Sequence, residues 1–283
     1  MWLYRKPVGA TSASVVQAFR DAHPGPWPLK VSHGGVLDPF AHGLVVVLVG
    51  AANRLFEHLH DAPKRYVARV EWGRETDTGD AGGRTVFEGD ARGLSADQLI
   101  TALPAFLGWK AQVPPATSNK RVDGERAYAR AHRGETVELP AQQVYLHEAR
   151  WLRHELPRWS ELEVLVRGGF YVRSLATELG RALNVGAHLS QLERSHLGPW
   201  THGEQPRALT GREVLPWLPS RELSDGEWGV VKQGGVLRPT TLTPPTAPVP
   251  AGFPPPPGMR CFHQGRLVAV FLESGAVVLP GGV

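Results

Sequence analysis

One aspartate stands out by its surroundings. In the segment SHGGVLDPFAHG, Ser32 to Gly43, Asp38 is the single carboxylate among glycines, a proline, two histidines and apolar residues. The apolar run Leu44 to Val49 follows at once. A solvated loop charge would not need this setting. A carboxylate in such a place can act as a nucleophile, provided that something keeps it ionised, because burial favours its neutral form.

Most familiar enzyme motifs are absent from the sequence. No G-x-x-x-x-G-K-[ST] or G-x-G-x-x-G pattern offers a nucleotide cradle, and neither H-E-x-x-H nor G-x-S-x-G occurs. His58 and His60 in FEHLHDAP could form a metal pair, but histidines at a helix end before a turn are far more common, and we expect no metal site. The candidates that remain are Asp38, Tyr66, Arg173 and a basic loop.

The bulk composition is that of an ordinary soluble globular protein. The 283 residues, 42% of them hydrophobic and 20% charged, suffice for one large domain or two unequal ones. The longest apolar run is too short to span a bilayer, no signal-peptide core is present, and the single Cys261 excludes an internal disulfide, so a reducing cytoplasm fits best. The net charge of +4 suits a polyanionic partner and equally a slightly basic enzyme of small molecules.

Predicted elements place the candidate residues. Alternation over 64–73 predicts a strand that carries Tyr66, and the same period recurs from residue 161 to 166. After a break at two glycines, apolar residues from Val172 to Leu183 follow helical spacing. Arg173 is therefore predicted in the first turn of a helix that begins just after a strand.

Two further segments lie between these elements. SADQLITALPAFLG predicts a helix with Ser95 as its N-cap. The stretch from Pro114 to Gly134 is rich in charge and poor in periodicity, so we expect a loop that is either functional or disordered.

The composition changes after Leu218. The proline-rich segment 244–258 can form neither a helix nor a central strand. Strand-like runs flank it at 235–242 and 266–280, the latter split by turn residues Glu273-Ser274-Gly275. This pattern predicts a small C-terminal β-domain.

Five motifs, taken in order, resemble the TruB family of tRNA pseudouridine synthases. HGGVLDPFAHG resembles the catalytic loop of that family, H-x-G-x-L-D-P-x-A-x-G. The others are RKPVGATSASVV, KRYVARVEWGRETDTGDAGGRTV, QVPPATSNKRVDGERAY and GGFYVRSLATELGRAL. They resemble the opening D-K-P-x-G-x-T-S, a strand and turn with T-D-T-x-D, the insertion P-P-x-Y-S-A-x-K and the helix start G-x-Y-[IV]-R. The resemblance covers nearly the whole chain, and the small β-domain is placed like the RNA-binding PUA domain of the family.

The resemblance implies a fold and an activity. We expect an α/β (α+β) catalytic domain over residues 1–220 with a mixed, largely antiparallel central sheet, and a PUA-like RNA-binding domain over 221–283. A basic RNA-binding insertion at about 112–135 is here named the basic arm. The implied enzyme is a cytoplasmic isomerase that converts uridine 55 in the T-arm of tRNA to pseudouridine, without a cofactor, a metal, a membrane or a protein partner, as a monomer.

Roles follow residue by residue from the resemblance. Asp38 either attacks C1′ of the uridine or drives elimination to a glycal. Arg173 keeps Asp38 ionised. Tyr66 can stack on the everted base and place its hydroxyl near the sugar, where it can act as a base toward C2′. His33 resembles the family histidine that helps to fill the vacated space in the T-loop. The other expected RNA contacts are Lys64, Lys120, Arg121, Arg126, Arg130, Arg133, Tyr171 and Leu192.

Each assignment has a plainer alternative. Arg173 could be a surface helix residue paired with a glutamate, Tyr66 a core tyrosine of its strand, and His33 a loop or capping residue. The basic arm could be a solvated charge run. The whole chain could modify another RNA, such as ribosomal RNA, or be a non-catalytic RNA-binding or tRNA-folding module. The intact set of Asp38, Tyr66 and Arg173 argues against the module.

Four residues depart from the family pattern. Arg5 replaces the opening aspartate, and His42 stands where serine or threonine is usual. Thr117 and Asn119 replace the tyrosine and alanine of P-P-x-Y-S-A. We expect these departures to affect RNA affinity or sequence context rather than the class of reaction.

Overall fold

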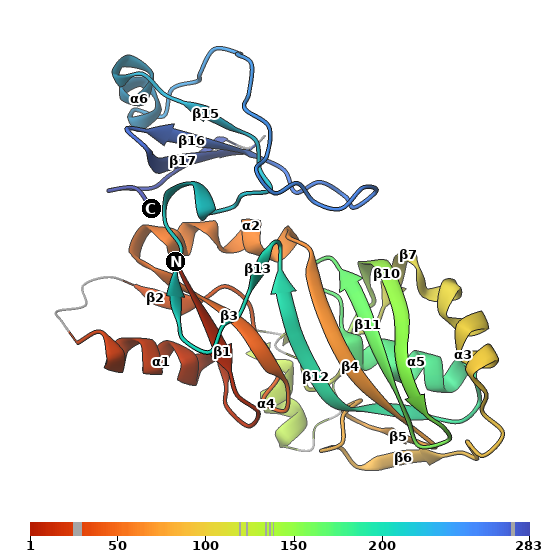
Figure 1. Ribbon diagram of the computed structural model, residues 1–283. Coiled ribbons are helices and arrows are strands. Elements are labelled where there is room, and N and C mark those ends of the chain that lie inside the picture. The colour runs from red at the N-terminus through yellow and green to blue at the C-terminus, as the bar shows by residue number, and fades with distance from the viewer. Residues whose placement is uncertain are drawn as a thin grey trace. The chain divides into compact units, whose positions relative to one another are not determined.

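The computed structural model describes residues 1–24, 30–118, 120–122, 124–133, 135, 137, 139–272 and 275–283. They form two compact units, shown as a ribbon in Figure 1. Unit 1 comprises Met1–Pro63 with Ser195–Val283, and unit 2 comprises Lys64–Arg194. Among the described residues, no helix has the length and apolar character needed to cross a membrane.

Unit 1 contains an antiparallel sheet in which β3 lies between β1 and β2, and β14 extends it beyond β1. Residues 43–48 of β3 are all buried, as expected of a strand covered on both faces. Helix α1 runs along these strands (Figure 1) and starts with a capping box at Thr11. The elements are β1 (Trp2–Lys6), α1 (Ser12–Ala22), β2 (Val31–His33), β3 (His42–Val49), η1 (Gly50–Leu55), α2 (Phe56–Asp61), β13 (Trp200–Thr201), β14 (Arg207–Ala208) and η3 (Gly211–Glu213).

The C-terminal part of unit 1 forms a second sheet with the order β15-β16-β17-β18, in which β15 and β16 are parallel. Phe262, Leu267 and Val270 of this sheet belong to the same hydrophobic cluster as Leu44 and Val46 of β3. The two sheets of unit 1 therefore share a core. The elements are β15 (Ser220–Glu222), α6 (Asp225–Lys232), β16 (Met259–His263), β17 (Arg266–Leu272) and β18 (Gly275–Val278).

The C-terminal sequence expectations are only partly met. Strands appear within 266–280, and the proline-rich segment 244–258 has neither helix nor strand, as predicted. The strand expected at 235–242 is wrong, since these residues form no strand. Helix α6 was not predicted. In the expected turn, Glu273 and Ser274 lie outside the described residues.

Unit 2 is built on strands in the order β12-β4-β11-β10-β7. The pairs β4–β11, β11–β10 and β10–β7 are antiparallel. As predicted, β4 is buried at every second residue. The strands are β4 (Lys64–Trp72), β5 (Arg74–Thr76), β6 (Thr85–Glu88), β7 (Gly108–Gln112), β10 (Gln142–Glu155), β11 (Trp159–Val166) and β12 (Ala187–Leu197), which continues into unit 1.

The two helices predicted in unit 2 are confirmed. Helix α5 (Val172–Ala182) follows β11 and buries Leu175, Ala176 and Leu179. Helix α3 (Ala96–Ala102) begins with a capping box at Ser95 and continues as η2 (Leu103–Phe106).

The basic arm was expected to lack regular structure, and this expectation is wrong. It contains β8 (Arg121–Val122), β9 (Glu125–Arg126) and α4 (Ala127–His132). Gly124 joins the two strands with φ +83°. Two-residue strands are too short to show a period in the sequence, and the Asp-Gly dipeptide before β9 was the available signal for a hairpin.

The expected fold class is confirmed as a mixed α/β protein with a largely antiparallel sheet and a C-terminal β sheet that fits a PUA-like domain. The domain boundary between residues 220 and 221 stays a prediction.

Gly180 fixes how closely α5 approaches the start of β12. A Cβ atom at Gly180 would lie 2.3 Å from the backbone nitrogen of Ala187 and 2.5 Å from the carbonyl carbon of Gly186. We expect Gly180→Ala to lower the free energy of unfolding by about 1–3 kcal/mol, because the backbones must move apart. Gly93→Ala is the control, since a Cβ at Gly93 meets no described atom within 4 Å. Urea denaturation of both variants measures the effect, and equal stability would contradict the close approach.

Candidate active site

Asp38 lies half-buried in the loop between β2 and β3 of unit 1. Its neighbour Leu37 is held on both backbone groups by Ser12, whose Oγ accepts from the Leu37 N–H at 2.9 Å and donates to the Leu37 carbonyl at 3.3 Å. The N–H of Ala41 donates to the Asp38 carbonyl at 3.1 Å. The backbone that carries the carboxylate is thereby fixed, although it belongs to no helix or strand.

The other side of the Asp38 loop is held by a buried ammonium group. Lys6 is 0% exposed, and its Nζ donates to the carbonyls of Pro7, Ala10 and Pro39 at 3.1, 2.7 and 3.2 Å. The N–H of Gly9 also donates to the Pro39 carbonyl, at 2.8 Å. Because a buried charge needs such partners, the opening motif RKPVGATS serves to fix the loop that carries Asp38.

Tyr66 lies in the middle of β4, opposite Val164 of β11, and is 9% exposed. Lys64 shares the buried face of the strand, and Leu192 is buried in β12. This burial agrees with a core role for Tyr66 and equally with a place where a base could stack.

Arg173 is the second residue of α5 and is only 3% exposed. A cation in the first turn opposes the helix dipole, and its burial is costly. Three groups within unit 2 help to compensate for this cost. The Nη1 of Arg173 donates to the Thr78 carbonyl at 2.8 Å and to Thr117 Oγ1 at 2.7 Å, and it lies 3.4 Å from Asp80 Oδ2. The interpretation of Arg173 as a surface residue is therefore wrong.

The turn between β5 and β6 is shaped to meet this guanidinium. Asp80 Oδ1 accepts from Thr78 Oγ1 at 3.0 Å and from the Gly82 N–H at 2.9 Å, which leaves Oδ2 directed at Arg173. Gly79 has φ +71°, and a Cβ atom on it would lie 3.2 Å from Arg173 Cβ. The T-D-T-G-D sequence thus brings a carboxylate and a carbonyl against the first turn of α5.

Tyr171, just before α5, has no side-chain cap of the usual kind. Its backbone is held instead by Gln112, which ends β7. The Tyr171 N–H donates to Gln112 Oε1 at 2.8 Å, and Gln112 Nε2 donates to the Tyr171 carbonyl at 3.1 Å. The start of the helix that carries Arg173 is therefore attached to the segment that leads into the basic arm.

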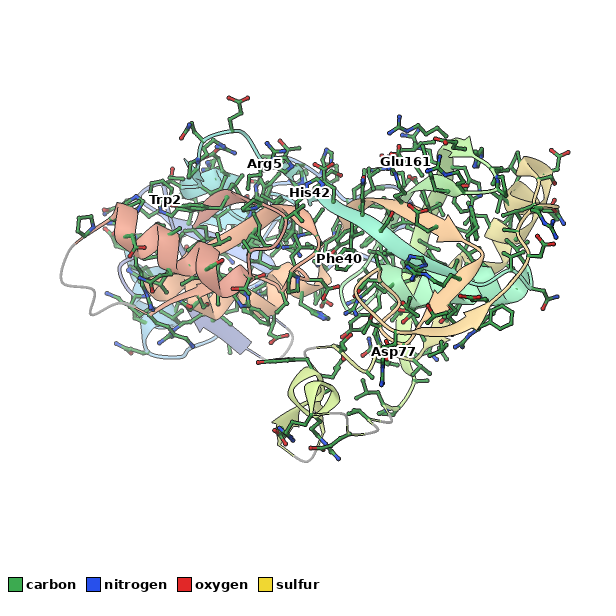
Figure 2. All side chains as sticks on the ribbon, turned by 90° about the horizontal axis from the view of Figure 1, so that it is seen from below. Trp2, Arg5, Phe40, His42, Asp77 and Glu161 are labelled. Atoms are coloured by element: carbon green, nitrogen blue, oxygen red, sulfur yellow. The ribbon has the colours of Figure 1, made fainter. Side chains whose placement is uncertain are left out.

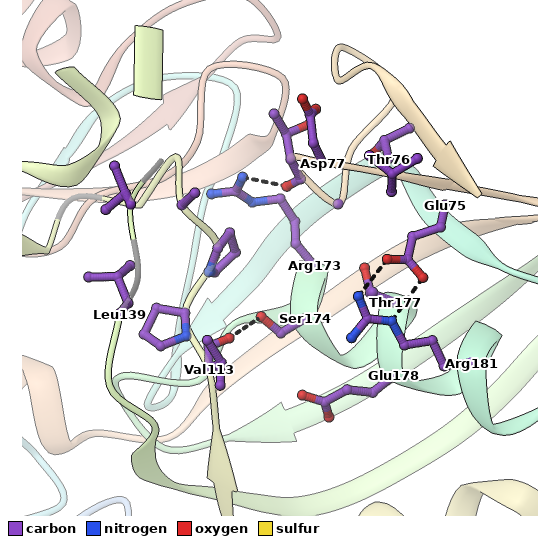
Figure 3. Close-up of a pocket in the computed structure, with 17 residues that line it drawn as sticks. Glu75, Thr76, Asp77, Val113, Leu139, Arg173, Ser174, Thr177, Glu178 and Arg181 are labelled. Carbon is purple, nitrogen blue, oxygen red and sulfur yellow. Dashed lines mark hydrogen bonds and ion pairs between the residues drawn. The ribbon is translucent and has the colours of Figure 1, made fainter. Parts of the chain in front are cut away.

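A cavity of about 610 Å³ opens in unit 2 beside α5 (Figure 3). On its wall Arg181 donates to both oxygens of Glu75, at 2.6 and 2.9 Å. Burial raises the pKa of Glu178, against smaller effects of Arg181 and Lys110. The volume is in the usual range of small-ligand sites. The lining residues are Glu75, Thr76, Asp77, Thr78, Gly79, Val86, Val113, Pro114, Pro115, Ala116, Val137, Leu139, Arg173, Ser174, Thr177, Glu178 and Arg181.

The basic arm carries its own counter-charges. Arg130 Nε donates to Glu135 at 2.8 Å, and Arg133 donates to Glu125 at 2.6 Å and to Glu135 at 2.7 Å. These hydrogen bonds raise the pKa of Arg133. Lys120 is exposed. The arm is therefore less positive than its lysine and arginines alone would make it.

The sequence-predicted residues are divided between the units. Asp38 and His33 belong to unit 1, where His33 ends β2, and all the others belong to unit 2. Arg121 and Arg126 are register partners in β8 and β9. The partners of Arg173 that the structure shows in unit 2 are Thr78, Asp80 and Thr117. None of these three residues was among the predicted RNA contacts.

Two of the family departures lie together in unit 1. Figure 2 shows Arg5 and His42 near each other, where β1 runs beside the start of β3. Thr117 was expected to affect RNA affinity or sequence context, and its Oγ1 accepts a hydrogen bond from Arg173 Nη1. Asn119 lies outside the described residues.

Sequence reasoning missed five residues that hold the candidate groups. Lys6, Ser12 and Asp80 lie inside motifs that resemble the family. The motifs therefore marked these residues, but they did not indicate what each residue does. Thr117 was visible only as a departure. Gln112 had no signal, because an amide at a strand end is recognisable only when its partner is known.

His58 and His60 lie in α2, and burial lowers the pKa of His58. In the parts of the chain that the structure describes, no three His, Cys, Asp or Glu side chains gather where they could hold a metal ion.

Comparison with known proteins identifies the family of this chain. A sequence model described as "TruB family pseudouridylate synthase (N terminal domain)" matches residues 27–172. A tRNA pseudouridine synthase B of Paracoccus denitrificans is 42% identical over 70% of this chain and 65% of its own length, so that alignment spans less than two thirds of the relative. The tRNA pseudouridine synthase B of Paenarthrobacter aurescens is 33% identical over 97% of this chain and 91% of its own.

Solved structures show the same fold. A crystal structure of a Cbf5-Nop10-Gar1 complex contains a chain that matches with a TM-score of 0.65 and 24% identity, over 96% of this chain and 78% of that one. The sequence matches, one of which extends over nearly the full length of both proteins, confirm the resemblance seen in the motifs. The chain belongs to the TruB family of pseudouridylate synthases.

Proposed function

We propose that this protein is an isomerase that converts uridine to pseudouridine at position 55 in the T-arm of tRNA. The names of its relatives, tRNA pseudouridine synthase B, support tRNA as the substrate class. The observation that carries the proposal is the buried guanidinium of Arg173. A helix gains no stability from a buried cation in its first turn, so a role in chemistry explains its presence better than packing does.

The reaction needs a carboxylate more than any other group. The N1–C1′ bond of the uridine breaks, the base turns, and a C5–C1′ bond forms. The proton on C5 then leaves to solvent, and N1 ends protonated. The electrons balance within the nucleoside, so we expect neither a cofactor nor a second substrate. A carboxylate can attack or stabilise the electron-poor sugar carbon, as in glycoside hydrolysis.

Asp38 is the proposed nucleophile, by direct attack or by way of a glycal. In this proposal its carboxylate forms an ion pair with Arg173 in the working enzyme. An arginine carries five N–H donors, enough to serve the Thr76–Asp80 turn, Thr117 and a second carboxylate together. Tyr66 stacks on the everted uracil and recovers part of the cost of unstacking.

The remaining assignments concern the RNA. His33, Lys64, Tyr171 and Leu192 are proposed to contact the T-loop around the target. The basic arm is proposed to contact backbone phosphates, with Lys120, Arg121, Arg126 and Arg130. We infer further that the protein works as a monomer in the cytoplasm, with tRNA as its partner.

The first test is tritium release from 5-tritiated uridine in unmodified tRNA, followed by mapping of the product. Release from a single site at position 55 is expected. Tritium release only from another RNA would show that the enzyme has a different substrate. Binding of tRNA without any tritium release would show that the chain is a non-catalytic binding module.

Asp38→Asn separates an enzyme from such a module. The change keeps the volume and removes the charge, so turnover should fall by at least ~10³-fold, the scale seen when a catalytic nucleophile is lost. The fold should persist, because Asp38 lies half-buried in the loop between β2 and β3 and the substitution keeps its volume. RNA binding should persist or tighten, as one negative charge near phosphates is lost. Near wild-type turnover by purified Asp38→Asn protein would remove Asp38 from the nucleophile role.

Asp80→Asn tests the support of Arg173. The asparagine amide would place either an N–H donor or a neutral oxygen against Arg173 Nη1, in place of the carboxylate. We therefore expect the free energy of unfolding to fall by about 1–3 kcal/mol and turnover to fall more than tenfold. Asp90→Asn is the matched control, because Asp90 pairs with Arg92 at the surface, where such pairs contribute little. Calorimetry and single-turnover rates measure both. Equal behaviour of the two variants would show that Asp80 does not support the site.

Binding of a T-arm stem-loop should weaken with salt. If about three phosphates are neutralised, affinity should fall roughly 10- to 100-fold between 50 and 200 mM salt. Lys120→Gln should lower the slope of log affinity against log salt by about one. Arg133→Gln should change that slope less, because Glu125 and Glu135 already compensate Arg133. Filter binding across a salt series decides this, and an affinity that does not change with salt would argue against an RNA substrate.

A further inference from the structure

The basic arm is attached to the start of α5 at both of its ends. Gln112 ends β7 at the first residue of the arm, Gln142 begins β10 after the arm, and the two are register partners. Gln112 holds the backbone of Tyr171 by two hydrogen bonds, and Gln142 Nε2 donates to the Gly169 carbonyl at 2.6 Å. The residues that lead into α5 are therefore fixed by the same two strands that carry the arm.

The link continues into the first turn of the helix. Ser174 Oγ donates to the Val113 carbonyl at 2.8 Å, a bond drawn in Figure 3. Four residues beyond Val113, Thr117 Oγ1 accepts from Arg173 Nη1 at 2.7 Å. The segment from Gln112 to Thr117 thus runs along the start of α5 and ends on the guanidinium itself.

Thr117 is well suited to hold a charged group in place. Its hydroxyl sits on a short β-branched side chain with few rotamers, so the acceptor position is fixed by the backbone. The Thr78 carbonyl and Asp80 contact Arg173 from the Thr76–Asp80 turn, and Thr117 contacts it from the arm side. A hydrogen bond from a charged donor is stronger than one between two neutral groups. Loss of the Thr117 acceptor would leave the buried guanidinium with an unsatisfied donor, which costs free energy.

We propose that Thr117 is a positioning residue for Arg173 and couples the root of the basic arm to the catalytic centre. The proposal rests on the proposed function. In the working enzyme, contact between the arm and the RNA backbone fixes the conformation of the segment from Gln112 to Thr117. Through the hydroxyl of Thr117, that segment then orients the guanidinium of Arg173. Thr117 stands where the family pattern has tyrosine.

The experiment compares three variants of the full-length protein on unmodified tRNA. Thr117→Val keeps the shape and removes the acceptor, whereas Thr117→Ser keeps the acceptor. Ser118→Ala is the matched control, because Ser118 Oγ is buried and has no hydrogen-bond partner within the described residues. For each protein, the single-turnover rate at saturating tRNA and the Kd for tRNA are measured, with a melting curve as a check of folding.

A positioning role predicts a split between rate and binding. Thr117→Val should lower the single-turnover rate about tenfold or more with Kd changed less than about threefold, since the loss is confined to a contact with a charged group. Thr117→Ser and Ser118→Ala should keep rates close to wild type. If the valine variant does not fold, Thr117→Ala is measured in its place with the same expectation.

Other outcomes would overturn the proposal. An unchanged rate in Thr117→Val would show that the hydroxyl does not position Arg173. A weaker Kd with an unchanged saturating rate would make Thr117 an RNA contact instead. Equal loss in Thr117→Val and Thr117→Ser would reduce its role to local packing. If the wild-type protein releases no tritium from tRNA, the proposed function fails first, which distinguishes the two failures.

Discussion

The burial of one positive charge constrains much of unit 2. Arg173 lies in the first turn of α5, where the helix dipole opposes it, and almost none of its side chain reaches solvent. Such a group is tolerated only with fixed acceptors around it. The Thr76–Asp80 turn provides a carbonyl and a carboxylate, and Thr117 provides a hydroxyl. Gly79 permits the close approach, since a side chain there would press on Arg173.

In unit 1, the loop that carries the negative charge of Asp38 must likewise be held in place. The Asp38 loop has no secondary structure of its own, and it is fixed from the N-terminal segment by Ser12 on one side and Lys6 on the other. Lys6 is itself buried against the carbonyl groups of Pro7, Ala10 and Pro39, so the loop is anchored through its main chain. Anchoring of this kind is what a preorganised nucleophile requires.

The sequence was informative where one period or one motif governs a whole element. The alternation in β4, the helical spacing of α5 and the Ser95 cap of α3 gave correct elements, and the motif order gave the family. It was uninformative where an element is too short to have a period, as in β8 and β9, or where glycines interrupt the helical pattern, as Gly226 and Gly229 do in α6. The partners of Arg173 were missed for a different reason. A hydrogen bond between Thr117 and Arg173 joins residues far apart in the chain, and neither residue type signals the other.

The central claim is that Asp80 and Thr117 act through one guanidinium, and a double-mutant cycle tests it most directly. The measured quantity is the single-turnover rate of pseudouridine formation in wild type, Asp80→Asn, Thr117→Val and the double variant. If both residues act by holding Arg173, the second change adds little once the first has released it, and the double variant loses much less than the product of the single losses. A loss equal to that product would show two independent effects and contradict the account.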